Sequence, residues 1–155
     1  MKNTAIIIPT RLAAKRFPNK PLAKINDLPM IIHVLNRAKE SNVGEVFVAT
    51  PDVEILKIVN ENGGNAILTE QDHVSGSDRI YEVYLKKLQK DIDMIINLQG
   101  DLPNIKPDSI FKLDKFMRNY NCDIGTLASS IKDKNDIKDS NIVKVHVEDN
   151  LENNN

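Results

Sequence analysis

The sequence has 155 residues, of which 41% are hydrophobic, so it can bury the core of one domain. Its 21 Lys and Arg residues stand against 22 Asp and Glu residues, and the net charge of -1 does not favour a nucleic-acid partner. The single cysteine, Cys122, excludes an intrachain disulfide and a multi-cysteine zinc site. No signal peptide or apolar run of membrane-spanning length is found, which predicts a cytoplasmic protein without a membrane partner.

The apolar pattern alternates between short strands and amphipathic helices. It predicts strands at residues 5–8, 45–49, 65–68 and 94–98, and two later strands at 124–130 and 142–147. Helical stripes of apolar residues cover 30–38, 55–59, 80–88 and 110–117. This order predicts an α/β fold with three α/β/α layers around a mostly parallel sheet. The polar residues 148–155 are predicted to be a tail, so the domain is expected over residues 1–147.

A basic loop directly follows the first predicted strand. Its four cations are Arg11, Lys15, Arg16 and Lys20. Open α/β sheets bind ligands at the carboxyl ends of their strands, and clustered cations repel one another unless an anion compensates, so the loop predicts a polyphosphate ligand. A solvated basic surface is the alternative. The loop's three prolines fix backbone angles and favour a shaped binding loop: Pro9, Pro18 and Pro21.

Two further segments carry candidate site residues. In the segment 73–79, Gly76 permits close backbone approach, and Ser77 or Asp78 could cap the helix that follows. This segment is either an ordinary helix start or a place where backbone N–H groups and hydroxyls contact a ribose or base.

The segment 97–103 follows the fourth predicted strand. Asp101 emerges there after a turn at Gly100, and a carboxylate so placed can hold Mg²⁺ against a triphosphate. An ordinary turn or cap residue is the alternative. The amide of Gln99 can donate and accept hydrogen bonds toward a polar substrate. Cations at one strand end and a carboxylate at another together predict phosphoryl or nucleotidyl transfer.

Five ordered motifs give the chain a family resemblance. They are Ile-Ile-Pro-Thr-Arg at 7–11, Arg-Phe-Pro-Asn-Lys-Pro-Leu at 16–22, Pro-Met-Ile-Ile-His-Val at 29–34, His-Val-Ser-Gly-Ser-Asp-Arg at 73–79 and Gln-Gly-Asp-Leu-Pro at 99–103. Asn-Ile-Val-Lys-Val at 141–145 extends the match. In this order they resemble the 3-deoxy-manno-octulosonate cytidylyltransferase family, also called CMP-Kdo synthetase. The resemblance runs over nearly the whole chain.

The resemblance implies a nucleotidyltransferase fold of the GT-A or Rossmann-like type, CTP and Kdo as substrates, Mg²⁺ as cofactor and a place in lipopolysaccharide biosynthesis. It implies that the Kdo anomeric hydroxyl attacks the α-phosphorus of CTP and that pyrophosphate leaves. By motif position, the CTP phosphates would be held by Arg11, Arg16 and Lys20. The nucleotide would lie along Ser75, Gly76, Ser77 and Arg79. Gln99 would face the nucleotide or sugar, and Asp101 would hold Mg²⁺.

Two residues and the length depart from the family pattern. Leu102 stands where the family usually has Glu, and Pro51 where it often has an acid. Family members continue well beyond residue 155, and that remainder supplies most Kdo contacts, a second metal-binding carboxylate and the homodimer interface. We therefore expect a C-terminally truncated or split protein that makes no CMP-Kdo alone and whose partner is a separately encoded C-terminal fragment. The alternatives are an inactive nucleotide-binding remnant and a cytidylyltransferase similar to CMP-sialic acid synthetase.

Overall fold

A computed structural model describes residues 3–13, 17–120 and 122–146. Backbone contacts divide the chain into two units, one ending at Asp123 and one beginning at Ile124, and each is described by itself. The expected single domain over residues 1–147 stays a prediction, and the expected tail over 148–155 lies outside the described residues.

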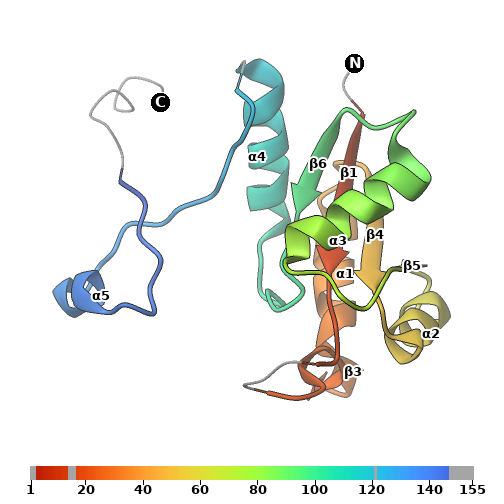
Figure 1. Ribbon diagram of the computed structural model, residues 1–155. Coiled ribbons are helices and arrows are strands. Elements are labelled where there is room, and N and C mark those ends of the chain that lie inside the picture. Colours follow the sequence, from red (N-terminus) through yellow and green to blue (C-terminus); the bar gives the residue numbers. More distant parts are fainter. Residues whose placement is uncertain (1–2, 14–16, 121, 147–155) are drawn as a thin grey trace. The chain divides into compact units, whose positions relative to one another are not determined.

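The first unit is built on a four-stranded parallel sheet (Figure 1). Its strands are β1 (Thr4–Pro9), β4 (Glu45–Thr50), β5 (Asn65–Leu68) and β6 (Met94–Asn97). They lie in the order β5-β4-β1-β6, so β1 pairs with β4 on one side and with β6 on the other. All six residues of β1 are buried, as a central strand covered on both faces requires. The four strands predicted for this part of the chain are therefore confirmed.

Helices cover both faces of this sheet. They are α1 (Met30–Glu40), α2 (Val53–Glu61), α3 (Gly76–Val83) and α4 (Pro107–Asn119). Successive side chains of a strand point to opposite faces. Accordingly, Ile6 and Ile8 of β1 belong to one apolar cluster, with residues of α1, α2 and α4, whereas Ala5 and Ile7 belong to a second cluster, with residues of α3. The predicted three-layer α/β/α arrangement is confirmed.

Short elements complete the first unit. A 3₁₀ turn (Lys20–Leu22) ends the basic loop, and a π-helical turn (Tyr84–Leu88) extends α3. Between the 3₁₀ turn and α1, β2 (Lys24–Ile25) and β3 (Leu28–Pro29) form an antiparallel hairpin. Its two turn residues have positive φ angles, as a two-residue hairpin turn demands: Asn26 at 47° and Asp27 at 65°.

The second unit contains one short helix in its described part, α5 (Lys134–Lys138). The strands expected at 124–130 and 142–147 are wrong for the described residues, which reach 146: neither segment forms a strand. Several of the described apolar residues there are exposed to solvent instead, and Ile124 and Val143 are 87% and 92% exposed. A strand needs a neighbouring strand for its backbone donors and acceptors, and the apolar pattern that predicted these two strands does not supply one.

No helix within the described ranges is both long enough and apolar enough to cross a membrane.

Candidate functional site

Several of the predicted site residues lie at the edge of the sheet where its parallel strands end. β1 and β6 both finish at this edge, and α3 begins beside it (Figure 1). An open cavity lies here, lined by Pro9, Thr10, Arg11, His73, Val74, Ser75, Gly76, Arg79 and Gln99. Five of the residues singled out in the sequence therefore surround one space: Arg11, Ser75, Gly76, Arg79 and Gln99.

The other four predicted residues are placed differently. Lys20 and Asp101 form an ion pair, with Nζ 2.7 Å from Oδ2, in the segments that follow β1 and β6. Ser77 lies in the first turn of α3, exposed and outside the cavity lining. Arg16 lies outside the described residues, so its place in the site stays a prediction.

The start of the basic loop is fixed by neighbouring strands and turns. The Thr10 N–H donates to the Ala49 carbonyl of β4 at 2.9 Å, which continues the sheet pairing past the end of β1. The Leu12 N–H donates to the Asp52 carboxylate at 2.7 Å, and the Leu12 carbonyl accepts from the Asn19 N–H at 3.1 Å. Arg11 therefore leaves the sheet from a backbone held on both sides, and its side chain lines the cavity.

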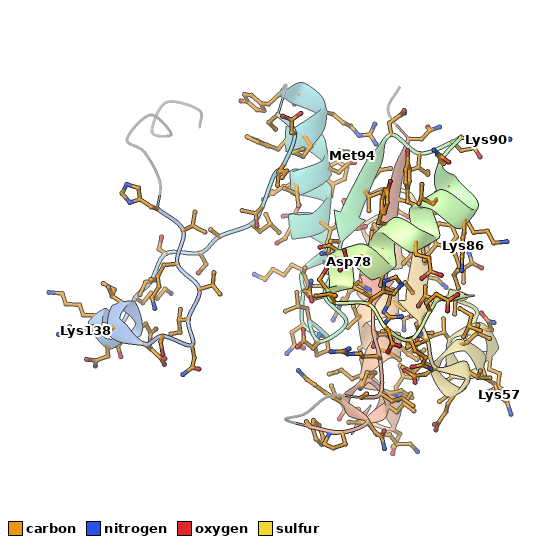
Figure 2. The ribbon with its side chains drawn as sticks, viewed as in Figure 1. Lys57, Asp78, Lys86, Lys90, Met94 and Lys138 are labelled. Atoms are coloured by element: carbon orange, nitrogen blue, oxygen red, sulfur yellow. The ribbon has the colours of Figure 1, made fainter. Side chains whose placement is uncertain are left out.

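The helix α3 presents its amino end to the cavity. Ser75 and Asp78 form a reciprocal cap: the Asp78 N–H donates to Ser75 Oγ at 3.2 Å, and the Ser75 N–H donates to Asp78 Oδ2 at 2.9 Å. Figure 2 shows Asp78 at this end of the helix. Because the first N–H groups of a helix are only partly paired and its dipole is positive there, this end favours an anion.

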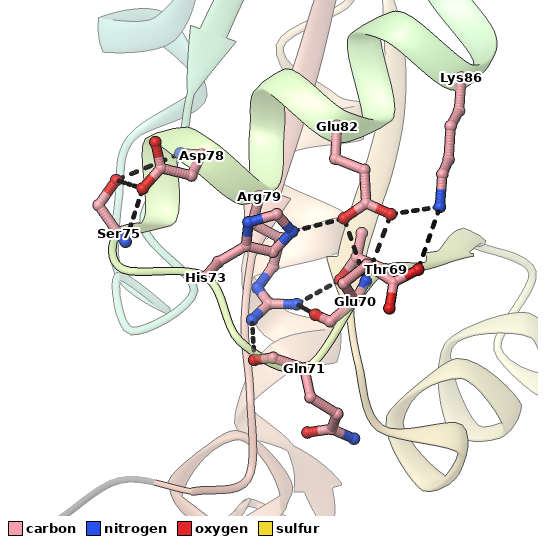
Figure 3. A network of polar contacts seen from close by, with 9 residues as sticks. All are labelled: Thr69, Glu70, Gln71, His73, Ser75, Asp78, Arg79, Glu82 and Lys86. Carbon is pink, nitrogen blue, oxygen red and sulfur yellow. Dashed lines mark hydrogen bonds and ion pairs between the residues drawn. The ribbon is translucent and has the colours of Figure 1, made fainter.

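Arg79 also lines this cavity, yet it is almost fully buried, with only 3% of the residue exposed. Its guanidinium donates to Thr69 Oγ1, to the Glu70 carbonyl at 2.8 Å and to the Gln71 carbonyl at 3.4 Å (Figure 3). Burial and the nearby charge of Arg11 lower the pKa of Arg79. Arg79 thus holds the loop between β5 and α3 in place, in addition to lining the cavity.

A second polar cluster ties the same loop to α3 (Figure 3). His73 Nε2 lies 2.5 Å from Glu82 Oε2, and the Glu70 N–H donates to the same oxygen at 3.1 Å. Lys86 Nζ donates to Glu82 Oε1. Partial burial by itself raises the pKa of Glu82, but the hydrogen bonds from Lys86, His73 and the Glu70 N–H outweigh it and lower that pKa to about 2. Glu82 is therefore a carboxylate at any physiological pH.

The turn after β6 approaches the end of β1 closely. A Cβ atom at Gly100 would lie 3.1 Å from the Pro9 carbonyl oxygen and 3.3 Å from Thr10 Cβ, so only glycine fits without a shift. This approach brings Gln99 to the cavity, where its amide also donates to Asn97 Oδ1 at 3.1 Å.

The donor set at this edge fits a metal ion that is held mainly by its substrate. In the part of the chain that the structure describes, no three His, Cys, Asp or Glu side chains gather at one point. Asp101 instead offers a half-exposed carboxylate beside Lys20. Mg²⁺ commonly takes one or two carboxylates and completes its octahedron with phosphate oxygens and water, so Asp101 fits this role.

A parallel sheet with a basic cavity at its carboxyl edge, and with the Lys20–Asp101 pair in the segments that follow β1 and β6, is that of an α/β nucleotidyltransferase. The family model described as cytidylyltransferase matches residues 5–154, and the chain belongs to this family.

Curated relatives indicate which members of the cytidylyltransferase family this chain is similar to in sequence. Two proteins named 3-deoxy-manno-octulosonate cytidylyltransferase, from Rhodopseudomonas palustris (strain BisB18) and Nitrobacter hamburgensis, are 45% and 47% identical over 144 and 143 residues. These matches cover 92% and 91% of this chain but 58% and 55% of the relatives, so the chain spans little more than half of their length. The resemblance inferred from the five motifs is confirmed.

Solved structures give the same likeness. A structure of CMP:2-keto-3-deoxy-manno-octonic acid synthetase complexed with CTP superposes with a TM-score of 0.71 at 44% identity, covering 76% of this chain and 48% of the other. A cytidylyltransferase from Leptospira borgpetersenii serovar Hardjo-bovis (strain JB197) superposes with a TM-score of 0.68 at 22% identity, which shows the shared fold alone; this match covers 78% of this chain and 51% of the other.

Three residues whose contacts help to shape the site received no role from the sequence. His73 lines the cavity, and its ring nitrogen Nε2 is bonded to the Glu82 carboxylate. The Asp52 carboxylate accepts the Leu12 N–H and so holds the start of the basic loop. His73 stands at the head of a motif that was singled out, so its place in that motif was an available signal. Asp52 and Glu82 act across 40 and 9 residues of sequence, and no local pattern predicts such contacts.

Proposed function

We propose that this chain binds CTP together with Mg²⁺ and forms the CTP-binding part of a 3-deoxy-manno-octulosonate cytidylyltransferase. The observation that carries the proposal is the convergence of Arg11, the capped start of α3 and Gln99 on one cavity. The Lys20–Asp101 pair joins the segments that follow β1 and β6, the same two strands that Arg11 and Gln99 follow. The CTP complex of the structurally similar synthetase and the names of the 45% and 47% identical relatives support it. Those names favour Kdo over a sialic acid as the sugar.

Each residue has a physical role in this proposal. Arg11, Arg16 and Lys20 hold the triphosphate, because guanidinium forks and ammonium groups bind phosphate oxygens strongly. The segment of Ser75, Gly76 and Ser77 supplies N–H groups and hydroxyls to the nucleotide, above Arg79. Gln99 faces the nucleotide or sugar. Asp101 holds Mg²⁺, which when bound would neutralise charge on the triphosphate.

The reaction of the whole protein is the attack of the Kdo anomeric hydroxyl on the α-phosphorus of CTP, with pyrophosphate as the leaving group. The residues named here serve this reaction by holding and orienting the triphosphate and by compensating its charge. Because the chain spans 55% to 58% of its curated relatives, we assign it the nucleotide-binding step and the full transfer to the whole protein.

The first test is nucleotide preference. We expect the chain to bind CTP with Mg²⁺ about tenfold more tightly than ATP or GTP, a difference of about 1.4 kcal/mol. The physical reason is that all three share the triphosphate, so only contacts to the base at the Ser75–Arg79 segment can discriminate among them. Calorimetric titration measures the three affinities, and equal values for the three nucleotides would overturn the cytidine assignment.

The second test is the metal. The Asp101→Asn substitution keeps the shape of the side chain and removes the charge that a hard cation prefers. We expect it to reduce the gain in CTP affinity that Mg²⁺ provides by about tenfold or more, in the range found when groups around a metal are altered. Titrations with Mg²⁺ and with EDTA measure this gain.

A matched control is available on α4. Asp108 is also an exposed carboxylate paired with a lysine, Lys112, at 2.9 Å. The Asp108→Asn substitution removes the same charge from the same kind of pair, and we expect the Mg²⁺ dependence to stay unchanged. If the Asp101 and Asp108 variants behave alike, Asp101 is a turn residue and the metal assignment is wrong.

A further inference from the structure

The contact between His73 and Glu82 determines which ring nitrogen carries a proton. Glu82 is ionised at physiological pH, so its oxygens only accept hydrogen bonds. His73 Nε2, 2.5 Å from Oε2, must therefore donate. In a neutral imidazole the other nitrogen, Nδ1, is then an acceptor. Among the described residues, no side chain other than Glu82 bonds to this ring (Figure 3).

The same ring lines the cavity that Arg11, Ser75 and Gln99 also line. Its side chain is only 17% exposed, and that of Glu82 only 11%, so solvent competes weakly for the bond between them. A ring held at Nε2 by a fixed carboxylate has a fixed orientation, and it presents Nδ1 as its remaining polar atom for a ligand.

Glu82 also acts on the backbone that carries His73. Its carboxylate accepts the Glu70 N–H, while Arg79 donates to the carbonyls of Glu70 and Gln71. The loop before α3 is thus held from two sides: the Glu82 carboxylate bonds its N–H group at Glu70, and the Arg79 guanidinium bonds its carbonyl groups. Removing the carboxylate would free both the ring and this N–H.

We infer that Glu82 is a positioning residue of the nucleotide site: it fixes the proton of His73 on Nε2 and holds residues 70–73 so that His73 meets the nucleotide through Nδ1. The inference rests on the proposed function for the identity of the ligand. It needs no contact between Glu82 and the nucleotide, because Glu82 acts through His73 and the Glu70 N–H.

The proton position is tested in the unaltered chain. NMR correlation of imidazole nitrogens with ring protons, in isotope-labelled protein and mildly alkaline solution, distinguishes the two neutral tautomers. The signals of His73 are assigned by their absence from the His73→Gln variant. We expect His73 to carry its proton on Nε2, and a His73 protonated only on Nδ1 would overturn the inference without any variant of Glu82.

The positioning effect is tested by Glu82→Leu, which removes every acceptor and keeps a good helix former. We expect it to weaken CTP binding about tenfold and to let His73 populate both tautomers, because hydrogen bonds to charged groups are the stronger ones in proteins. Glu82→Gln retains one acceptor oxygen, and we expect it to restore part of the affinity and of the Nε2–H signal.

The control is Glu61→Leu on α2, where Glu61 pairs with Lys57 four residues away, as Glu82 pairs with Lys86. Figure 2 shows Lys57 projecting from α2 and Lys86 from the turn that extends α3. We expect Glu61→Leu to leave CTP affinity and the His73 signals unchanged. Equal CTP affinities of the two Leu variants would overturn the inference. A parent chain that binds no CTP would instead overturn the proposed function, and the tautomer measurement would still decide the role of Glu82 at His73.

Discussion

The Gly44→Ala substitution is expected to lower the free energy of unfolding by about 3 kcal/mol, at the upper end of what overpacking costs. Gly44 directly precedes β4, and the pairing of Ala5 with Glu45 places it opposite Thr4. A Cβ atom at position 44 would penetrate the carbonyl oxygen of Thr4. The clash falls on backbone in the pairing of β1 with β4, so a side-chain rotation cannot relieve it.

Thr4 is also prevented from moving away. It is 4% exposed, its hydroxyl donates to Asp114 Oδ1 at 2.7 Å, and it accepts from Arg118 Nη2 at 2.8 Å. A shift of β1 at Thr4 would strain these contacts to α4 as well as the sheet pairing. Urea denaturation of the parent and the Gly44 variant measures the difference in unfolding free energy.

Gly63→Ala serves as the comparison. Gly63 has a φ angle of +70°, but a Cβ atom there would meet nothing within 4 Å. The Gly63→Ala substitution therefore lowers the free energy of unfolding only through the left-handed backbone conformation that alanine must adopt, by about 1 kcal/mol. If both alanine variants lose the same stability, the close approach of Gly44 to Thr4 contributes nothing and the packing argument fails.

The sequence predicted the first unit well because its signals are local. The buried run at 5–8 and the stripes of apolar residues at helical spacing each depend only on neighbouring residues, and alternating strands and helices restrict the topology to a parallel sheet. Parallel strands end at one edge, so residues that follow different strands were predicted to meet. Arg11 and Gln99 do line one cavity although 88 residues of sequence separate them.

The predictions from the sequence failed where a structure depends on a neighbour that is distant in the sequence. The segments 124–130 and 142–147 have apolar residues suited to strands, yet the described residues there remain unpaired as strands. Composition shows that a segment is compatible with a strand and does not show that a neighbour exists. Asp114 illustrates the same limit in a helix. It is buried, and its carboxylate is paired there with Arg118 and with the hydroxyl of Thr4, which lies 110 residues away in the sequence.

The Arg79→Leu substitution is expected to lower the free energy of unfolding by about 2–3 kcal/mol and to weaken CTP binding by tenfold or more. Arg79 satisfies Thr69 Oγ1 and the carbonyls of Glu70 and Gln71 from a buried position. Leucine fills part of the volume but leaves the buried Thr69 hydroxyl and the part-buried carbonyls without the guanidinium, and a buried polar group that loses its partner costs about 1–3 kcal/mol. The loop that carries His73 then loses the cation that holds its carbonyls.

Two further variants show whether the effects of Arg79→Leu come from the lost charge, from the lost planar geometry of the guanidinium, or simply from removing any arginine. Arg79→Lys keeps the charge but not the planar fork, so we expect it to fall between the parent and Arg79→Leu in both stability and affinity. Arg37→Leu removes an exposed arginine that pairs with Glu40 on α1 at 2.9 Å, and we expect it to change the unfolding free energy by less than about 0.5 kcal/mol. Thermal unfolding and CTP titration of all three variants provide the measurements. An Arg79→Leu chain that unfolds and binds CTP like the Arg37→Leu chain would show that the loop holds its shape without Arg79, and the nucleotide site would then have to be built from Arg11, the start of α3 and Gln99 alone.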